Sequence, residues 1–459
     1  MIPLKPLSEN LCICPRCRRT VTSNGIVING MRTLLDAHCN FCHSNYYIDL
    51  PSGHGLLTPV AIDKDTEELF DLAHAEWFSV ILGNSTKHKI FDHVPITFHR
   101  QRQHPRIVIL NCLDYLYGHC LLKLLNAQHY LDHHSDLACC VIVPKQLMHL
   151  VPDGVAEIWE VDLPLKAFQN WYVSLEDQCR QEIEVREICY LSVAHSHPHP
   201  SRYDLQRFVK LPEEIERAVR GAPVVVFAYR GDRTWGASGL WQTHNINALF
   251  QNLKLAFPTL SFVVTGFGKH GAFAGGIVDE RVQKYCIEQE RHWLKLYRAA
   301  DCVVGVHGSN MLLPSGLARH VVELLPEDRL GNITQDLLWP SYPIIGNEAL
   351  YRVRFLPGRP DLGDVKPNLV ASVIAHQLGG SKVFTSFMTA SLLPALDSSG
   401  VFDTRKLTGR VPGEAAAYMQ LLKDWTTRRL RRRSIRLQKR LQRGWLRLNK
   451  LMERKGAVL

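Results

Sequence analysis

The residues best suited to chemistry lie in a loop that follows an apolar run at residues 302–306. The run ends in Gly305 and Val306, and the loop continues with His307, Gly308, Ser309 and Asn310. A backbone without Cβ atoms can approach a diphosphate closely, and the unpaired N–H groups of a helix start favour an anion. Ser309 and Asn310 are suitable N-cap residues for such a helix. The pattern predicts a strand-to-helix turn that binds phosphate, and an ordinary connection in which the glycines serve only the turn is the alternative.

Two arginines occupy an equivalent place after an earlier apolar run. Arg230 and Arg233 follow residues 223–229, which read as a buried strand. Guanidinium groups next to a glycine suit bidentate recognition of phosphate oxygens, and surface salt bridges are the alternative. The run 260–264 reads as the next strand and leads to Gly266. Strands alternate with helices here, which predicts a Rossmann-like parallel sheet.

An earlier segment shows the same alternation. Strands are expected at residues 106–110, 139–143 and 155–161, with a helix between the first two. Asp114 and His119 follow the first strand, at the edge where open α/β sheets bind ligands. A capping or core role is the alternative for His119. Three alternating histidines at positions 195, 197 and 199 lie among Pro and Ser residues, and we interpret them as an exposed loop in preference to a metal site.

Two C-x-x-C pairs lie near the N-terminus. Their thiols belong to Cys14, Cys17, Cys39 and Cys42. Two such pairs 21 residues apart can close a tetrahedral site, so the spacing predicts a structural zinc ribbon, with unrelated free cysteines as the alternative. Cys12 and His43 are possible substitute ligands. The segment 51–55 reads as a linker.

Composition limits the classes to which the chain can belong. Its 459 residues suggest two or three domains, and thirteen cysteines, an odd number, favour free thiols in a reducing compartment. The first residues lack a signal peptide and no run of about 18 apolar residues appears, so we expect a cytoplasmic protein. The formal charge is +10, but thirteen Lys or Arg and one Glu lie between residues 428 and 455, so the rest of the chain is nearly neutral.

The region 288–308, followed by Val321-Val322-Glu323-Leu324, resembles the donor-domain signature of glycosyltransferase family 61. Ser309 and Asn310 stand where that family usually has alanine and glycine. The resemblance implies an inverting, metal-independent enzyme of GT-B architecture, in which two Rossmann-like domains face each other and the nucleotide-sugar lies mainly on the second. The zinc ribbon and the basic tail are additions to this core.

The resemblance also implies roles for individual residues. The diphosphate of the donor, expected to be a UDP-sugar, would be bound by Arg230, Arg233, His307 and the amides after Gly308, with no catalytic metal. Gly266 would lie near the nucleobase and Glu323 would accept hydrogen bonds from the ribose. The base that deprotonates the acceptor would be His119 or Asp114.

The complete prediction is an α/β protein with a zinc ribbon and linker (1–56), an acceptor domain (57–215), a nucleotide-sugar domain (216–380), a linker (381–414) and a basic amphipathic helical tail (415–459). Apolar residues on one face of the tail, among many arginines, indicate an anchor on an anionic membrane surface. A solvated helix or a short coiled coil is the alternative. The predicted function is transfer of a sugar to a glycan or lipid-linked glycan in bacterial surface polysaccharide biosynthesis, peripheral to the inner membrane. A nucleic-acid-binding protein that uses the ribbon and the tail, although the neutral body argues against it, and a glycosyltransferase-like protein without catalysis are the alternatives.

Overall fold

The computed structural model describes residues 1–392, except 8–11, 72–73, 200–202, 213–221, 269, 334, 336 and 340–351. For residues 380–392 it describes only the helical backbone. The predicted tail (415–459) and most of the predicted linker (381–414) lie outside these residues, and residues 381–392 belong to a helix. Among the described residues, no helix combines the length and the apolar character needed to cross a bilayer.

The N-terminal part of the chain forms an antiparallel sheet of five strands. In spatial and sequence order they are β2 (Thr22–Ile28), β3 (Thr33–His38), β4 (Asn45–Asp49), β5 (Val60–Asp63) and β6 (Leu69–Asp71). A one-turn helix η1 (Gly53–Leu56) joins β4 to β5, and α1 (Glu76–Lys87) follows β6. The predicted domain boundary at residue 56 therefore lies inside this sheet.

The next sheet, which we call the first domain, has six strands. Their order is β1 (Ile2–Lys5), β11 (Ile188–Leu191), β8 (Arg106–Asn111), β9 (Ala138–Pro144), β10 (Glu157–Val161) and β7 (Ile96–His99). The inner four are parallel, and β1 and β7 pair with them antiparallel at the two edges. Strand β1 belongs to this sheet although it precedes the cysteine-rich segment, so residues 1–56 are not a separate domain.

The two faces of this sheet are covered differently. Alternate residues such as Val108 and Val141 pack against α2 (Tyr117–Leu125) and α3 (Ala127–His133). Their neighbours Ile107 and Ile109 face a core shared with α4 (Val173–Glu184), α1 and the antiparallel sheet. Because each parallel strand is apolar on both faces, both must be covered, and the cysteine-rich sheet covers one of them.

The second domain has the strand order typical of Rossmann folds. All six strands are parallel, in the order β14 (Ile277–Val282), β13 (Ser261–Phe267), β12 (Val224–Arg230), β15 (Cys302–Val306), β16 (His320–Pro326) and β17 (Val353–Gly358). The chain moves outward from β12 to β14, then crosses back to β15 and continues the other way. The switch point between β12 and β15 is where such sheets bind ligands.

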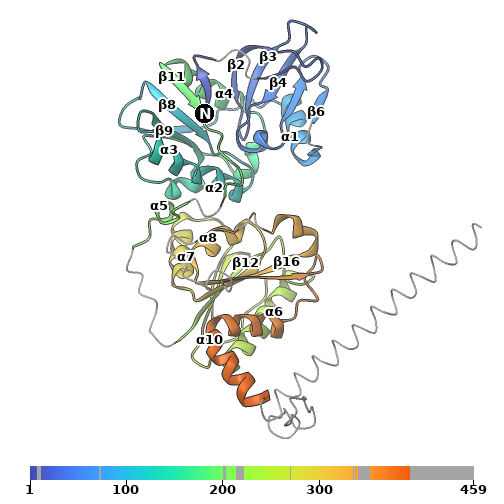
Figure 1. The fold of residues 1–459 in the computed structure, drawn as a ribbon, viewed down its shortest axis with the longest axis vertical. Coiled ribbons are helices and arrows are strands. Elements are labelled where there is room, and N and C mark those ends of the chain that lie inside the picture. Colours follow the sequence, from blue (N-terminus) through green and yellow to red (C-terminus); the bar gives the residue numbers. More distant parts are fainter. Residues whose placement is uncertain are drawn as a thin grey trace, which may run out of the picture. The chain divides into compact units, whose positions relative to one another are not determined.

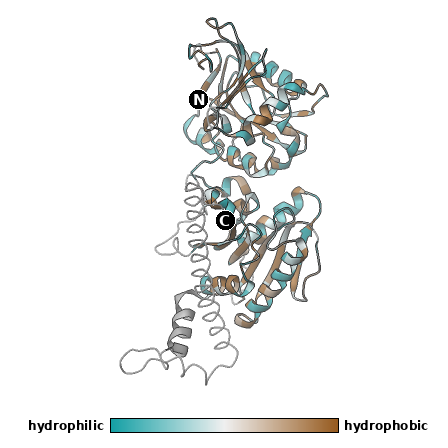
Figure 2. Cartoon of the chain, turned by 90° about the vertical axis from the view of Figure 1, so that its right-hand side faces the viewer, coloured by the Kyte–Doolittle hydropathy of each residue, from teal (hydrophilic) through white to brown (hydrophobic). Residues whose placement is uncertain are grey.

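Helices cover both faces of the second sheet (Figure 1). Helices α7 (Ile287–Ala299) and α8 (Leu312–Leu317) lie on one face, and α6 (Gly239–Ala256) and α10 (Pro367–Leu392) lie on the other. In Figure 2 apolar residues, in brown, concentrate on the strands, whereas the helices also carry polar residues in teal. The prediction of two Rossmann-like units is thus confirmed. The short helices that remain are η2 (Lys145–Leu150), η3 (Leu165–Gln169), α5 (Gln206–Val209), η5 (Ser309–Met311) and η6 (Glu327–Asn332).

One predicted helix is shorter than expected. The sequence of residues 282–298 predicts one long helix, but α7 begins only at Ile287. Val282 is instead the last residue of β14, and residues 283–286 connect the strand to the helix. Residues 277–282 are half-exposed at the sheet edge and carry charged side chains, so they lack the apolar run by which buried strands are recognised.

Candidate functional site

The predicted phosphate loop lies at the switch point of the second domain. Strand β12 ends at Arg230, and the neighbouring strand β15 ends at Val306, directly before His307 and Gly308. The parallel pairing of these strands brings both carboxyl ends to one sheet edge. The structure therefore places the arginines beside the glycine loop, although almost 80 residues separate them in sequence.

Gly308 is the point on which both guanidinium groups converge. A Cβ on Gly308 would lie 2.1 Å from Nη1 of Arg230 and 3.0 Å from Nη1 of Arg233. Its φ of 148° also belongs to a region that residues with a Cβ rarely adopt. Arg233 donates a hydrogen bond to the His307 carbonyl (2.7 Å), and Arg230 donates one to Oδ1 of Asn310 (3.1 Å). Glycine is needed here because two cations pack against the backbone.

Arg230 also has an acidic neighbour. Its Nε and Nη2 donate to the two carboxylate oxygens of Asp232, at 2.8 and 2.6 Å. The Asp232 side chain is 73% exposed, whereas that of Arg230 is 15% exposed. The hydrogen bond from Arg230 lowers the pKa of Asp232 below its ordinary value. The salt-bridge role considered for Arg230 is thus present, and a bound diphosphate would share the guanidinium with Asp232.

His307 and Glu323 do not take the places expected of them. Nδ1 of His307 lies 2.5 Å from Oε2 of Glu323, and both side chains are almost completely buried. Neither residue lines the large cavity described below. The His307 carbonyl accepts a hydrogen bond from Arg233, and Glu323 in β16 holds the His307 ring. Glu323 therefore orients the loop and is not positioned to bind a ribose.

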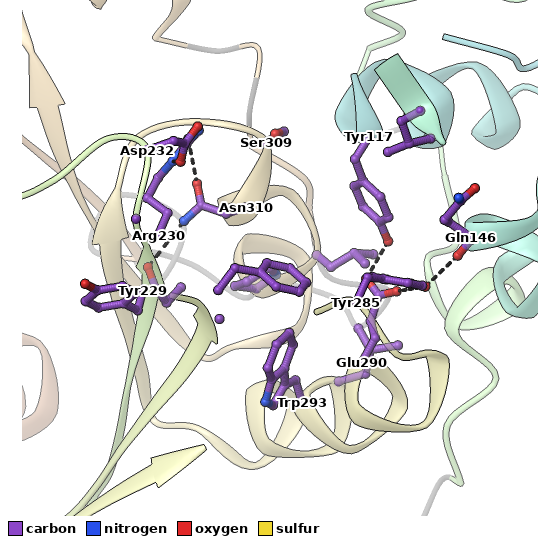
Figure 3. A pocket seen from close by; sticks show the side chains of 18 of the residues that line it. Tyr117, Gln146, Tyr229, Arg230, Asp232, Tyr285, Glu290, Trp293, Ser309 and Asn310 are labelled. Atoms are coloured by element: carbon purple, nitrogen blue, oxygen red, sulfur yellow. Dashed lines mark hydrogen bonds and ion pairs between the residues drawn. The ribbon is translucent and has the colours of Figure 1, made fainter. Parts of the chain in front are cut away.

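A cavity of about 550 Å³ opens beside the loop. Arg230, Ser309 and Asn310 lie together at one side of it, and Trp293 lines it between them and the opposite wall (Figure 3). Gly266, in β13, lines it as well; a Cβ there would lie 2.0 Å from the Tyr229 carbonyl. Gly305 is buried within β15 under Met311 and does not line the cavity. An apolar cavity with a few polar groups at one end suits a ligand with a flat apolar part and an anionic part.

A carboxylate with aromatic partners forms the opposite wall. Tyr117 donates its hydroxyl hydrogen to Oε1 of Glu290 (2.5 Å), and the Tyr285 hydroxyl lies 2.6 Å from Oε2 of Glu290 and from the Gln146 carbonyl (Figure 3). Burial raises the pKa of Tyr117 and Tyr285, and the charge of Glu290 raises both further. Both phenols therefore remain protonated donors. None of these residues was predicted, because nothing in their spacing marks them.

Asp114 and His119, selected as candidate bases, contact each other in the first domain. Both follow β8, and Nδ1 of His119 lies 3.2 Å from Oδ1 of Asp114. Asp114 is completely buried, whereas the side chain of His119, in the first turn of α2, is 16% exposed. A carboxylate on Nδ1 fixes the imidazole tautomer and leaves Nε2 to accept a proton, which is the arrangement of a general base.

The environment keeps the Asp114 carboxylate ionised. Burial alone would raise its pKa, but the Lys123 ammonium, 2.9 Å from Oδ2, and the hydrogen bonds from His119 and His54 hold the pKa of Asp114 well below its ordinary value. Lys123 is itself buried and donates to the Leu113 carbonyl (2.8 Å). The ion pair is thus part of the core of the first domain.

Two further histidines, which the sequence analysis did not select, complete this cluster. Nε2 of His54 lies 3.0 Å from Nδ1 of His119 and 3.4 Å from Oδ2 of Asp114. The His197 ring centre lies 5.4 Å from that of His119. Burial lowers the pKa of both His54 and His197 to about 4, so both are neutral near pH 7.

The interpretation of residues 51–55 as a linker is therefore wrong. Ser52 and Gly53 hydrogen-bond to the backbone after β11, at Ser192 and Val193, and His54 is buried. His197 follows the same strand and is partly buried, so the expectation of an exposed loop holds for His195 and His199 only. The alternation of the three histidines could have indicated His197 as a site residue, whereas no sequence pattern marks His54.

The two candidate centres lie close to each other. A Cβ on Gly118, which precedes His119, would lie 2.6 Å from the Cβ of Ser309. The first turn of α2 therefore touches the phosphate loop. The Asp114–His119 pair and the glycine loop with its two arginines thus border the same region.

The four cysteines of the C-x-x-C pairs lie together. Cys14 and Cys42 have Sγ atoms 3.5 Å apart, as do Cys17 and Cys39. Tetrahedral zinc with Zn–S bonds of about 2.3 Å separates its sulfurs by about 3.8 Å, so the four thiols suit a closed zinc site. The possible substitutes Cys12 and His43 are not in this group.

Comparisons with known proteins give remote structural similarities. No family model matches the chain, and no curated protein matches it in sequence. The chain is similar to E. coli ADP-heptose lipopolysaccharide heptosyltransferase II, with a TM-score of 0.36, 11% identity, and coverage of 60% of this chain and 99% of the other. It is similar to E. coli heptosyltransferase WaaC with ADP, with a TM-score of 0.36, 13% identity, and coverage of 59% and 99%. Glycosyltransferase SnogD of Streptomyces nogalater gives a TM-score of 0.22, 12% identity, and coverage of 57% and 75%. Similarity at this level says nothing about the reaction or the substrate of this chain.

Proposed function

We propose that the protein is an inverting glycosyltransferase that moves a sugar from a nucleotide-sugar to a glycan acceptor. The observation that carries this proposal is the contact between two switch-point sites. Arg230 and the glycine loop lie at the carboxyl ends of β12 and β15 in the second domain. The Asp114–His119 pair follows β8 in the first domain, and Gly118, next to His119, lies against Ser309. Sugar transfer needs both functions within reach of one anomeric carbon.

The loop of the second domain would bind the donor. The Arg230 guanidinium and the polar groups of Ser309 and Asn310 would hold the diphosphate and stabilise it as it leaves. The apolar cavity beside them would take the nucleobase, and Glu290 at the far wall would accept hydrogen bonds from hydroxyl groups. A UDP-sugar is the donor we propose, and these contacts require no catalytic metal.

The pair in the first domain would activate the acceptor. Nε2 of His119 would remove the proton from the acceptor hydroxyl while its oxygen attacks the anomeric carbon opposite the diphosphate, which inverts the configuration. Asp114 would hold Nδ1 and stabilise the imidazolium that forms. The buried Asp114–Lys123 pair keeps that carboxylate ionised throughout.

The remaining parts would serve stability and location. Zinc on the four cysteines would stabilise the antiparallel sheet, which shares a core with the first domain. We further propose a role in bacterial surface polysaccharide biosynthesis, on an acceptor that is a glycan or a lipid-linked glycan. The basic tail at 415–459 would bind the anionic inner membrane from the cytoplasmic side, and this part of the proposal rests on sequence alone.

Calorimetric titration with UDP, GDP, CDP, dTDP and ADP, without divalent metal, tests the donor site. We expect one of these nucleotides to bind at micromolar strength. Because a charge-assisted hydrogen bond contributes about 1.5–3 kcal/mol, Arg230→Ala should weaken that binding about 10- to 100-fold. Arg329→Ala is the matched control, since that arginine lies in η6 and does not line the cavity. Equal nucleotide affinity in Arg230→Ala and the native protein would refute the donor assignment.

A further inference from the structure

The cluster around Asp114 has a geometry that general-base chemistry does not explain. Ligand-type atoms of three residues lie close together: His54 Nε2 to His119 Nδ1 is 3.0 Å, His119 Nδ1 to Asp114 Oδ1 is 3.2 Å, and His54 Nε2 to the second carboxylate oxygen, Oδ2, is 3.4 Å. The shortest of these distances joins the two nitrogens. A hydrogen bond between the two rings requires a lone pair on one of these nitrogens, and that nitrogen then faces an Asp114 oxygen with no hydrogen between them.

These distances suit three ligands of one cation. Bonds of about 2.0–2.1 Å to tetrahedral zinc place neighbouring ligand atoms about 3.3 Å apart. Two imidazoles and one carboxylate are ligands that zinc and similar dications accept. Among the described residues, these three and the four cysteines are the two groups of three or more His, Cys, Asp or Glu side chains that lie close enough together to hold a metal ion.

A third histidine lies beside this group. The His197 ring centre is 5.4 Å from that of His119 and 6.1 Å from that of His54.

One neighbour opposes a cation. The Lys123 ammonium lies 2.9 Å from Oδ2 of Asp114, and its charge would repel a metal ion. It also donates to the Leu113 carbonyl, which fixes it on the buried side of the carboxylate. Lys123 would therefore weaken metal binding and make the site exchangeable, in contrast to the closed cysteine site.

We propose that His54, Asp114 and His119 form a second metal site, which binds Zn²⁺ or a similar first-row dication reversibly. A metal on Nδ1 of His119 leaves the ring proton on Nε2, where the acceptor proton would have to go. Metal binding therefore blocks the base, and zinc inhibits sugar transfer. The inhibition rests on the proposed function, whereas the metal site does not.

Metal content of the full chain after dialysis against a zinc buffer tests the site. We expect two equivalents of zinc in the native protein, and one in both His54→Ala and His119→Ala. His133→Ala, which changes an exposed histidine of α3, is the matched control and should keep two. The equivalent retained in the site variants shows that their cysteine site, and hence the sheet around it, is folded. Replacing zinc with cobalt shows which site the retained ion occupies, because thiolate ligands give charge-transfer bands in the cobalt spectrum and histidine and aspartate ligands do not.

One equivalent in the native protein, or two in both site variants, would overturn the proposal. The nucleotide titration with Arg230→Ala is a separate measurement. If the nucleotide binds but only one zinc does, the metal site alone is wrong; if two zinc ions bind but no nucleotide does, the proposed function alone is wrong.

Discussion

Replacing Gly308 with alanine tests whether the glycine loop and the two arginines form one anion site. The new Cβ would lie 2.1 Å from Nη1 of Arg230 and 3.0 Å from Nη1 of Arg233, so both guanidinium groups must move. Their hydrogen bonds to Asn310 and to the His307 carbonyl would be strained or lost. The substitution adds one methyl group and leaves the charge of the site unchanged.

The expected magnitudes follow from these contacts. A residue with a Cβ at φ 148° costs about 1–3 kcal/mol of backbone strain, which should lower the free energy of unfolding by a similar amount. Displacing the Arg230 guanidinium removes a charge-assisted hydrogen bond, so nucleotide diphosphate affinity should fall about 10- to 100-fold. The affinity loss should therefore persist under conditions where the variant is fully folded.

Isothermal titration calorimetry and urea unfolding measure the two effects separately. Gly275→Ala is the matched control, because a Cβ at that position has no atom within 4 Å. We expect it to keep both the affinity and the stability of the native protein. Unchanged affinity in folded Gly308→Ala would show that the arginines do not act together with the loop, and the anion site would have to be sought elsewhere.

Three further predictions concern the other parts of the site. His119→Ala should lower transfer at least about 100-fold in a sugar-transfer assay while nucleotide affinity stays unchanged, and retained activity would exclude His119 as the base. His54 has its pKa lowered from 6.5 to about 4 by burial, so the unfolded chain binds more protons between these pH values; stability from this group is complete above about pH 6.5, and about 3 kcal/mol of it is lost as the pH falls towards 4. Urea unfolding at pH 7 and pH 5 should show about 2 kcal/mol of this loss, and the loss should shrink in His54→Gln. An equal loss in both proteins would contradict the assignment. Cys14→Ser should lose the structural zinc and lower the thermal unfolding midpoint, whereas Cys286→Ser, at an exposed thiol, should do neither; a midpoint that responds equally to both substitutions would argue against a structural zinc.

The sequence was sufficient for features that depend on neighbouring residues. Apolar runs of five to seven residues identified β8, β9, β12 and β15, because strands buried on both faces are mostly apolar. Arg230, Gly308, Asp114 and His119 were selected as candidates because each follows such a strand, and parallel strands bring their carboxyl ends to one edge. The cysteine pairs were found because their spacing is itself the signal.

Only the tertiary structure decided which of these residues meet. The order of the strands placed Arg230 beside Gly308, and no local pattern encodes that order. His54 appeared to lie in a linker because glycines flank it, yet the antiparallel sheet packs on the first domain and buries His54 against Asp114. Glu323 appeared to suit a ribose, yet its place in β16 directs it to His307. Short-range patterns fix strands and turns, whereas side-chain contacts between distant segments follow from how the sheets are covered.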